Sequence, residues 1–133
     1  MENETIRFEP IGYITTGISR REALPRQGIN GNLEGELILY ERFAAGAADI
    51  KPGEEYFVLF YFNKSEGAAL YVPKRGKGVF STRSPERPNP IGLSRIKILY
   101  NKGGKIRFIG ADMLEDTPIL DIKPVMETEG PFA

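Results

Sequence analysis

The residues best suited to chemistry stand in one short loop, Arg83–Pro90, which contains Arg83, Arg87, Asn89 and three prolines. Each proline fixes φ and lacks an N–H, and the residue before it is pushed toward extended backbone. The loop, here called the arch, is therefore stiff, and its arginines lose little backbone entropy on meeting a ligand. Because binding residues are often carried by loops on a rigid scaffold, the arch is predicted to hold the active site. A proline-rich surface turn is the alternative.

Cysteine and histidine are both absent from the 133 residues. The sequence therefore excludes disulfides, thiolate nucleophiles, Ser-His-Asp triads and zinc sites built from Cys or His. A general acid or base would have to be an Asp, Glu, Lys or Tyr side chain. No metal site is expected, and the sequence does not single out a catalytic residue.

The charged residues are segregated along a chain whose formal net charge is zero. The segment Tyr71–Arg107 holds ten Lys or Arg residues and a single acid, Glu86. Such an asymmetry indicates a surface that meets a polyanion, with nucleic acid as the obvious case. The alternative is that strands interleave in the fold and bring acids beside these cations.

Length and composition are ordinary for one soluble domain, with 133 residues, 41% hydrophobic and 27% charged. The acidic N-terminus and the lack of a long apolar run show neither a signal-peptide nor a membrane-spanning pattern. We therefore expect a cytoplasmic protein with no membrane contact. Residues 1–133 are expected to form a single domain, with a loose tail from about residue 126.

Alternating apolar residues predict a series of short strands. Ile6–Ile14 and Leu33–Leu39 show the alternation, and Tyr56–Phe62 is apolar throughout, which predicts a strand covered on both faces. Tyr40–Ile50 is expected to be a short helix. Further strands are expected at Gly78–Thr82, Ile91–Tyr100, Ile106–Ala111 and Ile119–Pro124, and Tyr71–Pro73 is expected to extend toward Gly76 and Gly78. Ile96 and Ile98 are expected to face one way, and Arg95 and Lys97 the other. The glycine-containing stretch 101–105 is expected to be a hairpin turn into Ile106–Ala111. About seven short strands with at most one or two short helices predict an all-β sandwich or barrel.

Three stretches combine proline, glycine and polar residues in an unusual way: Leu24–Gln27, Gly78–Ser94 and Asp116–Pro124. In this order they resemble the motifs of the TsaA-like (TrmO-type) family of S-adenosylmethionine-dependent tRNA methyltransferases. The similarity extends over nearly the whole chain, from Ile11 to Pro124. The resemblance implies a compact single-domain β-barrel that works as a homodimer. It also implies methylation of N6 of threonylcarbamoyladenosine beside the anticodon of tRNA.

The resemblance also implies where S-adenosylmethionine binds. The implied cofactor residues are Pro25, Arg26, Gln27, Asn63, Lys64, Arg83, Leu93, Glu115, Asp116, Thr117 and Pro118. An arginine, Arg83 or Arg26, suits the methionine carboxylate. Methyl transfer from a sulfonium is an in-line displacement that needs neither a metal nor a covalent enzyme intermediate. Close alignment of the nucleophile and the methyl group supplies much of the catalysis.

The basic segment would then meet the tRNA, largely through phosphate contacts. The residues expected on the substrate side are Lys74, Arg75, Lys77, Arg87, Asn89 and Lys123. Each assignment has a simpler alternative: surface charges for Arg83 and Arg87, a loop cap for Gln27, a turn residue for Asn89, and an ion pair between Asp121 and Lys123.

The chain departs from the resembled family at two places. Asn63-Lys64 stands where family members commonly have His-Gln, and a lysine near a cationic sulfonium is compatible with binding only if it points away. Glu115-Asp116 stands where they commonly have Asp-Gly, and losing glycine removes easy access to positive φ, although Asp tolerates it better than most residues.

The sequence also lacks the C-terminal extension of longer relatives, so tRNA selectivity is expected to arise elsewhere in the chain. Two functional alternatives remain at this stage. One is the same barrel holding S-adenosylmethionine, another adenine ligand or RNA without catalysis. The other is a basic-faced RNA binder with no cofactor.

Overall fold

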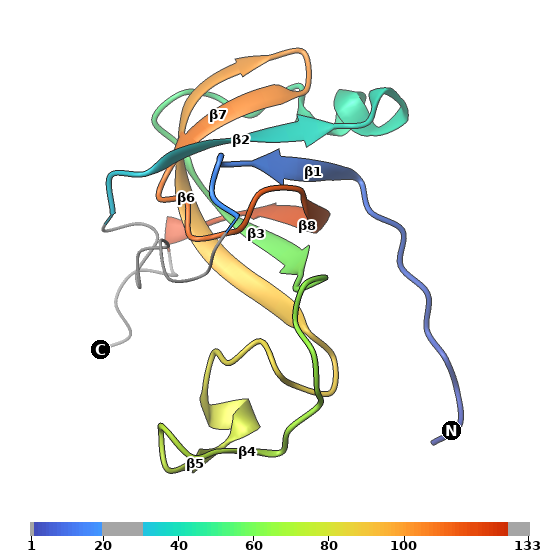
Figure 1. Ribbon diagram of the computed structural model, residues 1–133. Helices are drawn as coiled ribbons and strands as arrows, with labels where there is room; N and C mark the ends of the chain where they lie inside the picture. The colour runs from blue at the N-terminus through green and yellow to red at the C-terminus, as the bar shows by residue number, and fades with distance from the viewer. Residues whose placement is uncertain (1, 20–30, 128–133) are drawn as a thin grey trace.

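Six strands close into an antiparallel barrel in the order β1-β2-β7-β6-β3-β8 (Figure 1). This computed structural model describes residues 2–19 and 31–127. The barrel strands are β1 (Gly12–Thr15), β2 (Glu34–Leu39), β3 (Glu55–Tyr61), β6 (Ile91–Lys102), β7 (Lys105–Ile109) and β8 (Thr117–Pro124). Because β1 pairs with both β2 and β8, the sheet closes on itself and leaves no barrel strand with an open edge. The predicted all-β barrel is confirmed.

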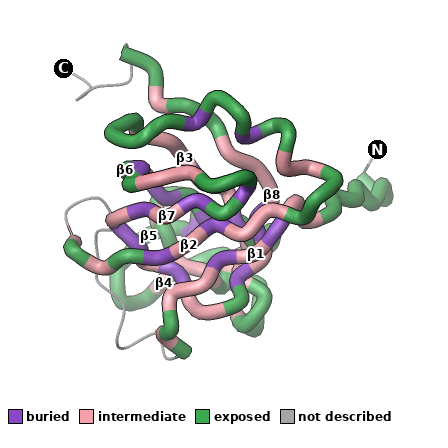
Figure 2. The backbone as a smooth tube through the Cα atoms, turned by 90° about the horizontal axis from the view of Figure 1, so that it is seen from above, coloured by how far each residue is buried: buried purple, intermediate pink, exposed green. Residues whose placement is uncertain are grey.

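The barrel is filled by the inward-facing half of each strand. In β6 the alternate residues Gly92, Ser94, Ile96 and Ile98 are buried, whereas Lys97 between them is exposed. Figure 2 shows the same division for the described part of the chain, with buried residues along the barrel strands and exposed residues along the loops. The opposite orientations predicted for the isoleucines and the basic residues of this strand are therefore confirmed.

A tight hairpin joins β6 to β7. Its turn contains Gly103 and Gly104, whose φ angles are 61° and 92°. A left-handed backbone of this kind carries little steric cost only for glycine. The structure thus confirms the hairpin that the sequence predicted at this point.

In the described residues, two short 3-10 helices accompany the strands. The first, η2 (Glu41–Ala47), follows β2 and buries Ala47 in the core. The amide of Asn101 on β6 donates to the carbonyls of Ala47 and Ile50 at 2.8 and 3.1 Å, which fixes η2 and the residues after it to that end of the barrel. The predicted short helix is confirmed in position, and its turns are of the tighter 3-10 type.

Three details of the strand prediction are wrong. The first strand begins at Gly12, and the preceding arm leaves Ile6 and Phe8 exposed by 74% and 73%. Alternating apolar residues do not form a strand unless another strand pairs with them. Both edges of β1 are already paired, one with β2 and the other with β8. The strand predicted to be covered on both faces is β3, and only its residues Val58 and Phe60 are buried. In a barrel, one face of each strand points to the core and the other points outward. Finally, most of the predicted strand before the arch is the second 3-10 helix, η3 (Val79–Ser81).

A small hairpin lies outside the barrel wall. Strands β4 (Tyr71–Val72) and β5 (Lys77–Gly78) pair with each other, and in Figure 1 they lie beyond one end of the barrel. Val79 is buried and its N–H donates to the carbonyl of Leu70 at 2.9 Å, so the base of this hairpin is held firmly. No helix in the described residues is long and apolar enough to span a bilayer.

Candidate active site

A pocket of about 560 Å³ lies at the end of the barrel from which the β4–β5 hairpin projects. Four parts of the chain line it: the end of β3 with the residues that follow, the segment from Phe80 to Arg87, the start of β6, and the β7–β8 connection. The volume lies within the usual range of about 300–1,000 Å³ for small-molecule sites. The pocket is thus built where motifs distant in sequence converge.

Aromatic side chains form much of the apolar lining. Phe60 and Phe62 pack edge to face with ring centroids 5.1 Å apart, and Phe80, which is 76% exposed, lies at the pocket as well. Gly92 on β6 faces Phe60, and a Cβ at this glycine would lie 2.3 Å from the phenyl ring. Gly92 therefore leaves the space that the ring of Phe60 occupies.

Hydrogen bonds to its neighbours brace the arch. The N–H of Phe62 donates to the carbonyl of Pro90 at 2.8 Å, and that of Ala69 donates to Glu86 at 3.1 Å. Just before the arch, the hydroxyl of Thr82 accepts from the N–H of Ser84 at 3.2 Å. These contacts join the arch to the segment after β3, in agreement with the stiffness that its prolines predict.

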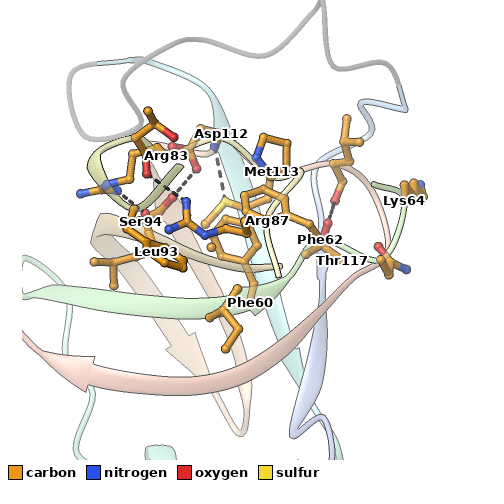
Figure 3. Close-up of a pocket in the computed structure, with 17 residues that line it drawn as sticks. Phe60, Phe62, Lys64, Arg83, Arg87, Leu93, Ser94, Asp112, Met113 and Thr117 are labelled. Carbon is orange, nitrogen blue, oxygen red and sulfur yellow. Dashed lines mark hydrogen bonds between the residues drawn. The ribbon is translucent and has the colours of Figure 1, made fainter. Parts of the chain in front are cut away.

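The two arginines of the arch contact backbone carbonyls. Arg83 Nη1 donates to the carbonyl of Leu93 at 2.8 Å, and Arg87 Nη1 donates to those of Thr82 and Ser84 at 2.9 and 3.2 Å. Both line the pocket (Figure 3). A guanidinium carries five N–H groups, so these bonds orient each arginine and leave it further donors for a ligand.

Two buried polar side chains line the pocket. Ser94 and Thr117 are the buried polar residues of the described chain, with exposures of 5% and 4%, and both line the pocket. The Ser94 hydroxyl donates to Asp112 Oδ1 at 2.5 Å, and the Thr117 hydroxyl donates to the carbonyl of Leu114 at 2.7 Å. Burying a polar group costs desolvation free energy, and both buried polar residues of the described chain lie at the pocket.

The two places where the chain departs from the resembled family contact each other. Lys64 Nζ donates to the carbonyl of Glu115 at 2.9 Å, and the Glu115 carboxylate accepts the N–H groups of Thr16 and Gly17 at 2.7 and 2.8 Å. Asp116 has a φ of 65°, the one positive φ among the described non-glycine residues. The left-handed position expected for the missing glycine is therefore present, and Asp116 occupies it.

The structure gathers part of the predicted cofactor set around the pocket. Asn63, Lys64, Arg83, Leu93 and Thr117 line it. Glu115, Asp116 and Pro118 flank Thr117 along the chain but are not part of the lining. Pro25, Arg26 and Gln27 lie outside the described residues.

Among the predicted substrate residues, only Arg87 lines the pocket. Lys74, Arg75 and Lys77 lie on the exposed β4–β5 hairpin. Asn89 is exposed, and its carbonyl accepts the N–H of Ile91 at 2.7 Å. Lys123 pairs with Asp121 at 2.9 Å, which matches the ion-pair alternative.

The cations of the basic segment differ in whether they pair with acids. On the barrel wall, Arg95 pairs with Glu55 at 2.6 Å, and Arg107 pairs with Glu34 at 2.8 Å. By contrast, no described carboxylate lies within ion-pair distance of the hairpin residues Lys74, Arg75 and Lys77. Strand interleaving therefore neutralises part of the basic segment, while the hairpin beside the pocket keeps its positive charge.

Three pKa shifts occur on barrel strands, outside the pocket lining. Burial and a hydrogen bond to Glu54 raise the pKa of Tyr56, and a hydrogen bond to Glu36 raises the pKa of Tyr100. A hydrogen bond to Glu34 raises the pKa of Arg107. None of these side chains lines the pocket. Within the described ranges, no group of three or more acidic side chains is placed to hold a metal ion.

Sequence reasoning missed Phe80, Ser94 and Asp112 as site residues. A polar Ser94 at an inward position between Gly92 and Ile96 was a usable signal, because such a residue needs a buried partner. Its partner Asp112 is 18 positions away, after β7, and only the closed barrel brings the two together.

A closed antiparallel barrel with a ligand-sized pocket beneath a braced, arginine-bearing arch defines a small-molecule-binding β-barrel. Residues 13–129 match the family model for the tRNA-methyltransferase O N-terminal domain, TrmO_N. The chain belongs to this family, which confirms the resemblance seen in its motifs.

Known relatives agree with this assignment. A "probable S-adenosyl-L-methionine-binding protein" of Methanothermobacter thermautotrophicus is 34% identical, with 96% of this chain and 95% of that protein covered. The human "tRNA (adenine(37)-N6)-methyltransferase" is 36% identical over 98% of this chain and 33% of its own length. The solved TrmO of Pseudomonas aeruginosa superimposes with a TM-score of 0.83 at 30% identity, covering 98% of this chain and 60% of that one.

A second TrmO structure gives a TM-score of 0.87 at 31% identity. The chain covers 98% of its own residues in that comparison and 62% of the TrmO chain. It therefore spans about three fifths of the solved TrmO proteins and a third of the human enzyme.

Proposed function

We propose that this chain is an S-adenosylmethionine-dependent methyltransferase that acts on N6 of threonylcarbamoyladenosine beside the anticodon of tRNA. One observation carries the proposal: in a chain of this family, the arch, the segment after β3 and the β7–β8 connection converge on one ligand-sized pocket. The names of the relatives, an S-adenosyl-L-methionine-binding protein and a tRNA (adenine(37)-N6)-methyltransferase, support both the cofactor and the substrate.

The pocket fits the chemical groups of the cofactor. Arg83, held by the Leu93 carbonyl, has further N–H donors for a methionine carboxylate. Phe60 and Phe62 offer apolar surface to an adenine ring, and Asn63 offers both a donor and an acceptor. When bound, S-adenosylmethionine supplies an electrophilic methyl group on a positively charged sulfur.

The protein's own contribution is alignment. The braced arch and the barrel end hold the lining residues in place, and a fixed approach of nucleophile to methyl group lowers the barrier without any bond to the protein. The proposed cofactor set also includes Pro25, Arg26, Gln27, Lys64, Leu93, Glu115, Asp116, Thr117 and Pro118.

The tRNA is proposed to approach over the β4–β5 hairpin. Arg75 and Lys77 are exposed there and carry no ion pair within the described residues, so they suit phosphate contacts. Phe80, exposed at the pocket, offers a face on which a loop base can stack. Arg87, Asn89 and Lys123 complete the proposed substrate set.

We further propose that residues 1–133 act as one domain and that the working enzyme is a cytoplasmic homodimer. Exposed apolar side chains near the pocket, including Leu70 and Tyr71 at 68% and 57%, give a second copy a surface to cover. Analytical ultracentrifugation of the purified protein tests this, and a monomer at all concentrations would overturn the dimer.

The function is tested by transfer of labelled methyl from S-adenosylmethionine to tRNA that carries threonylcarbamoyladenosine, alongside calorimetric titration with the cofactor. Wild type is expected to bind and to label the tRNA. Arg83→Ala should bind about 10–100-fold more weakly, because charge-assisted hydrogen bonds are lost. Arg42→Ala, an exposed arginine paired with Glu9, serves as the matched control. Cofactor binding with no methylation would instead support a non-catalytic binding module.

A further inference from the structure

Within the described residues, Asp112 is the only carboxylate that lines the pocket. The other charged side chains there are the cations Lys64, Arg83 and Arg87. The chain has no histidine or cysteine, and the hydroxyl and amide groups of the lining are poor bases. Asp112 is therefore the described pocket residue able to accept a proton.

The geometry around Asp112 holds its carboxylate in place. The hydroxyl of Ser94, a residue only 5% exposed, donates to Asp112 Oδ1 at 2.5 Å (Figure 3). Ser94 lies on β6 two residues after Gly92, so it is anchored in the barrel wall.

The reaction proposed above requires a proton acceptor. N6 of threonylcarbamoyladenosine carries one hydrogen, and replacing it with methyl releases that proton. Charge moves from the sulfur to N6 as the new bond forms, so a carboxylate beside N6 stabilises the transition state more than the ground state.

We propose that Asp112 is the general base of this reaction and that Ser94 positions it. This inference rests on the proposed function. The N6–CH₃ bond forms as the S–CH₃ bond breaks, with its electron pair left on a neutral thioether. The N6–H proton passes to the Asp112 carboxylate and then to solvent. Asp112 is thus a catalytic residue, and Ser94 is a positioning residue that acts through it.

Asp112→Asn keeps the shape of the side chain and removes its basicity, so it is the first test. Its kcat is expected to fall by about 10²–10⁴, the usual contribution of a general base. Its affinity for S-adenosylmethionine should stay within about threefold of wild type. Ser94→Ala is expected to lower kcat by about tenfold, because a hydrogen bond to a charged group is lost. Asp49→Asn, an exposed aspartate outside the pocket, should leave kcat unchanged.

A binding measurement separates this role from a merely structural one. With S-adenosylhomocysteine present, wild type should bind an anticodon stem-loop with threonylcarbamoyladenosine about tenfold more tightly than the same stem-loop already methylated at N6. The substrate has an N6–H for Asp112 to accept and the product has none. Asp112→Asn should reduce this preference to about threefold or less.

The two proposals fail in different ways. If wild type binds cofactor but methylates no tRNA, the proposed function fails. If wild type methylates and folded Asp112→Asn keeps its kcat, or keeps the full preference for the unmethylated stem-loop, the assignment of Asp112 as base is overturned.

Discussion

At the scale of single residues, Lys64 brings a positive charge to a pocket proposed to hold a cation. Its ammonium group is engaged by the carbonyl of Glu115 at 2.9 Å. Lys64→Gln keeps a donor for that carbonyl and removes the charge. We expect it to strengthen S-adenosylmethionine binding by about 0.5–1 kcal/mol, or two- to fivefold, because a repulsion between like charges is removed.

Calorimetric titration with S-adenosylhomocysteine provides the control, because its sulfur is neutral. The affinity for this ligand should change little in Lys64→Gln. Equal gains for both ligands would mean that the substitution acts on the shape of the pocket and not on its charge.

At the scale of elements, the pairing of β3 with β6 depends on Gly92. A methyl group at this position would lie 2.3 Å from the ring of Phe60, and that ring also lines the pocket. Gly92→Ala is expected to destabilise the protein by about 1–3 kcal/mol, as overpacking does, and to weaken cofactor binding. Urea denaturation and calorimetry would measure the two effects.

Gly46→Ala is the matched control for this substitution. Nothing lies within 4 Å of a Cβ at Gly46, which is in η2 at the far end of the barrel from the pocket. It should be neutral or slightly stabilising, by about 0.4–1 kcal/mol at most. A Gly92→Ala protein as stable as wild type would show that Phe60 has room to move.

Substitutions at Asp116, in the turn before β8, measure how much a left-handed backbone conformation costs in stability. Asp116 is exposed with a φ of 65°. Asp116→Ala should be less stable than Asp116→Gly by about 1–2 kcal/mol, because Ala meets the steric penalty of a left-handed backbone and Gly does not. Thermal unfolding of both variants measures the difference. Equal stabilities would indicate that the turn adjusts its backbone.

Many of the strands and turns could be predicted from the sequence, because they are determined by residues close together in the chain. Alternation gave β2 and the orientation of Ile96 and Ile98, and the glycine pair gave the β6–β7 turn. The start of β1 could not be predicted, because Ile6 and Phe8 alternate like a strand but have no partner strand. The contact between Ser94 and Asp112 likewise depends on barrel closure, which joins positions 18 residues apart.

At the scale of the whole molecule, some cations of the basic segment pair with acids on the barrel wall, whereas those of the β4–β5 hairpin have no ion pair within the described residues. Acids on β2 and β3 pair with Arg107 and Arg95, whereas Arg75 and Lys77 stand on the hairpin that projects beside the pocket. The sequence showed the excess charge but could not assign it to a surface. Strand pairing between distant segments determines which cations meet acids.

The hairpin charges are expected to govern how tRNA binding responds to salt. Replacing Arg75 and Lys77 by Ala should lower the slope of log K against log[salt] by about 1.4 in magnitude, since each phosphate contact to unpaired RNA contributes about 0.7. Cofactor affinity should not change, because neither residue lines the pocket. Fluorescence anisotropy with an anticodon stem-loop over a salt series measures the slope.

The matched control removes two exposed lysines from other surfaces, Lys51 and Lys97, neither of which lines the pocket. Lys51 follows Ile50, which Asn101 fixes to the barrel end opposite the pocket. If binding is steered by the hairpin, this control keeps the wild-type slope, and the hairpin variant alone becomes less sensitive to salt. Parallel slopes for wild type and the hairpin variant would place the tRNA on another face, because net charge alone acts on both variants equally.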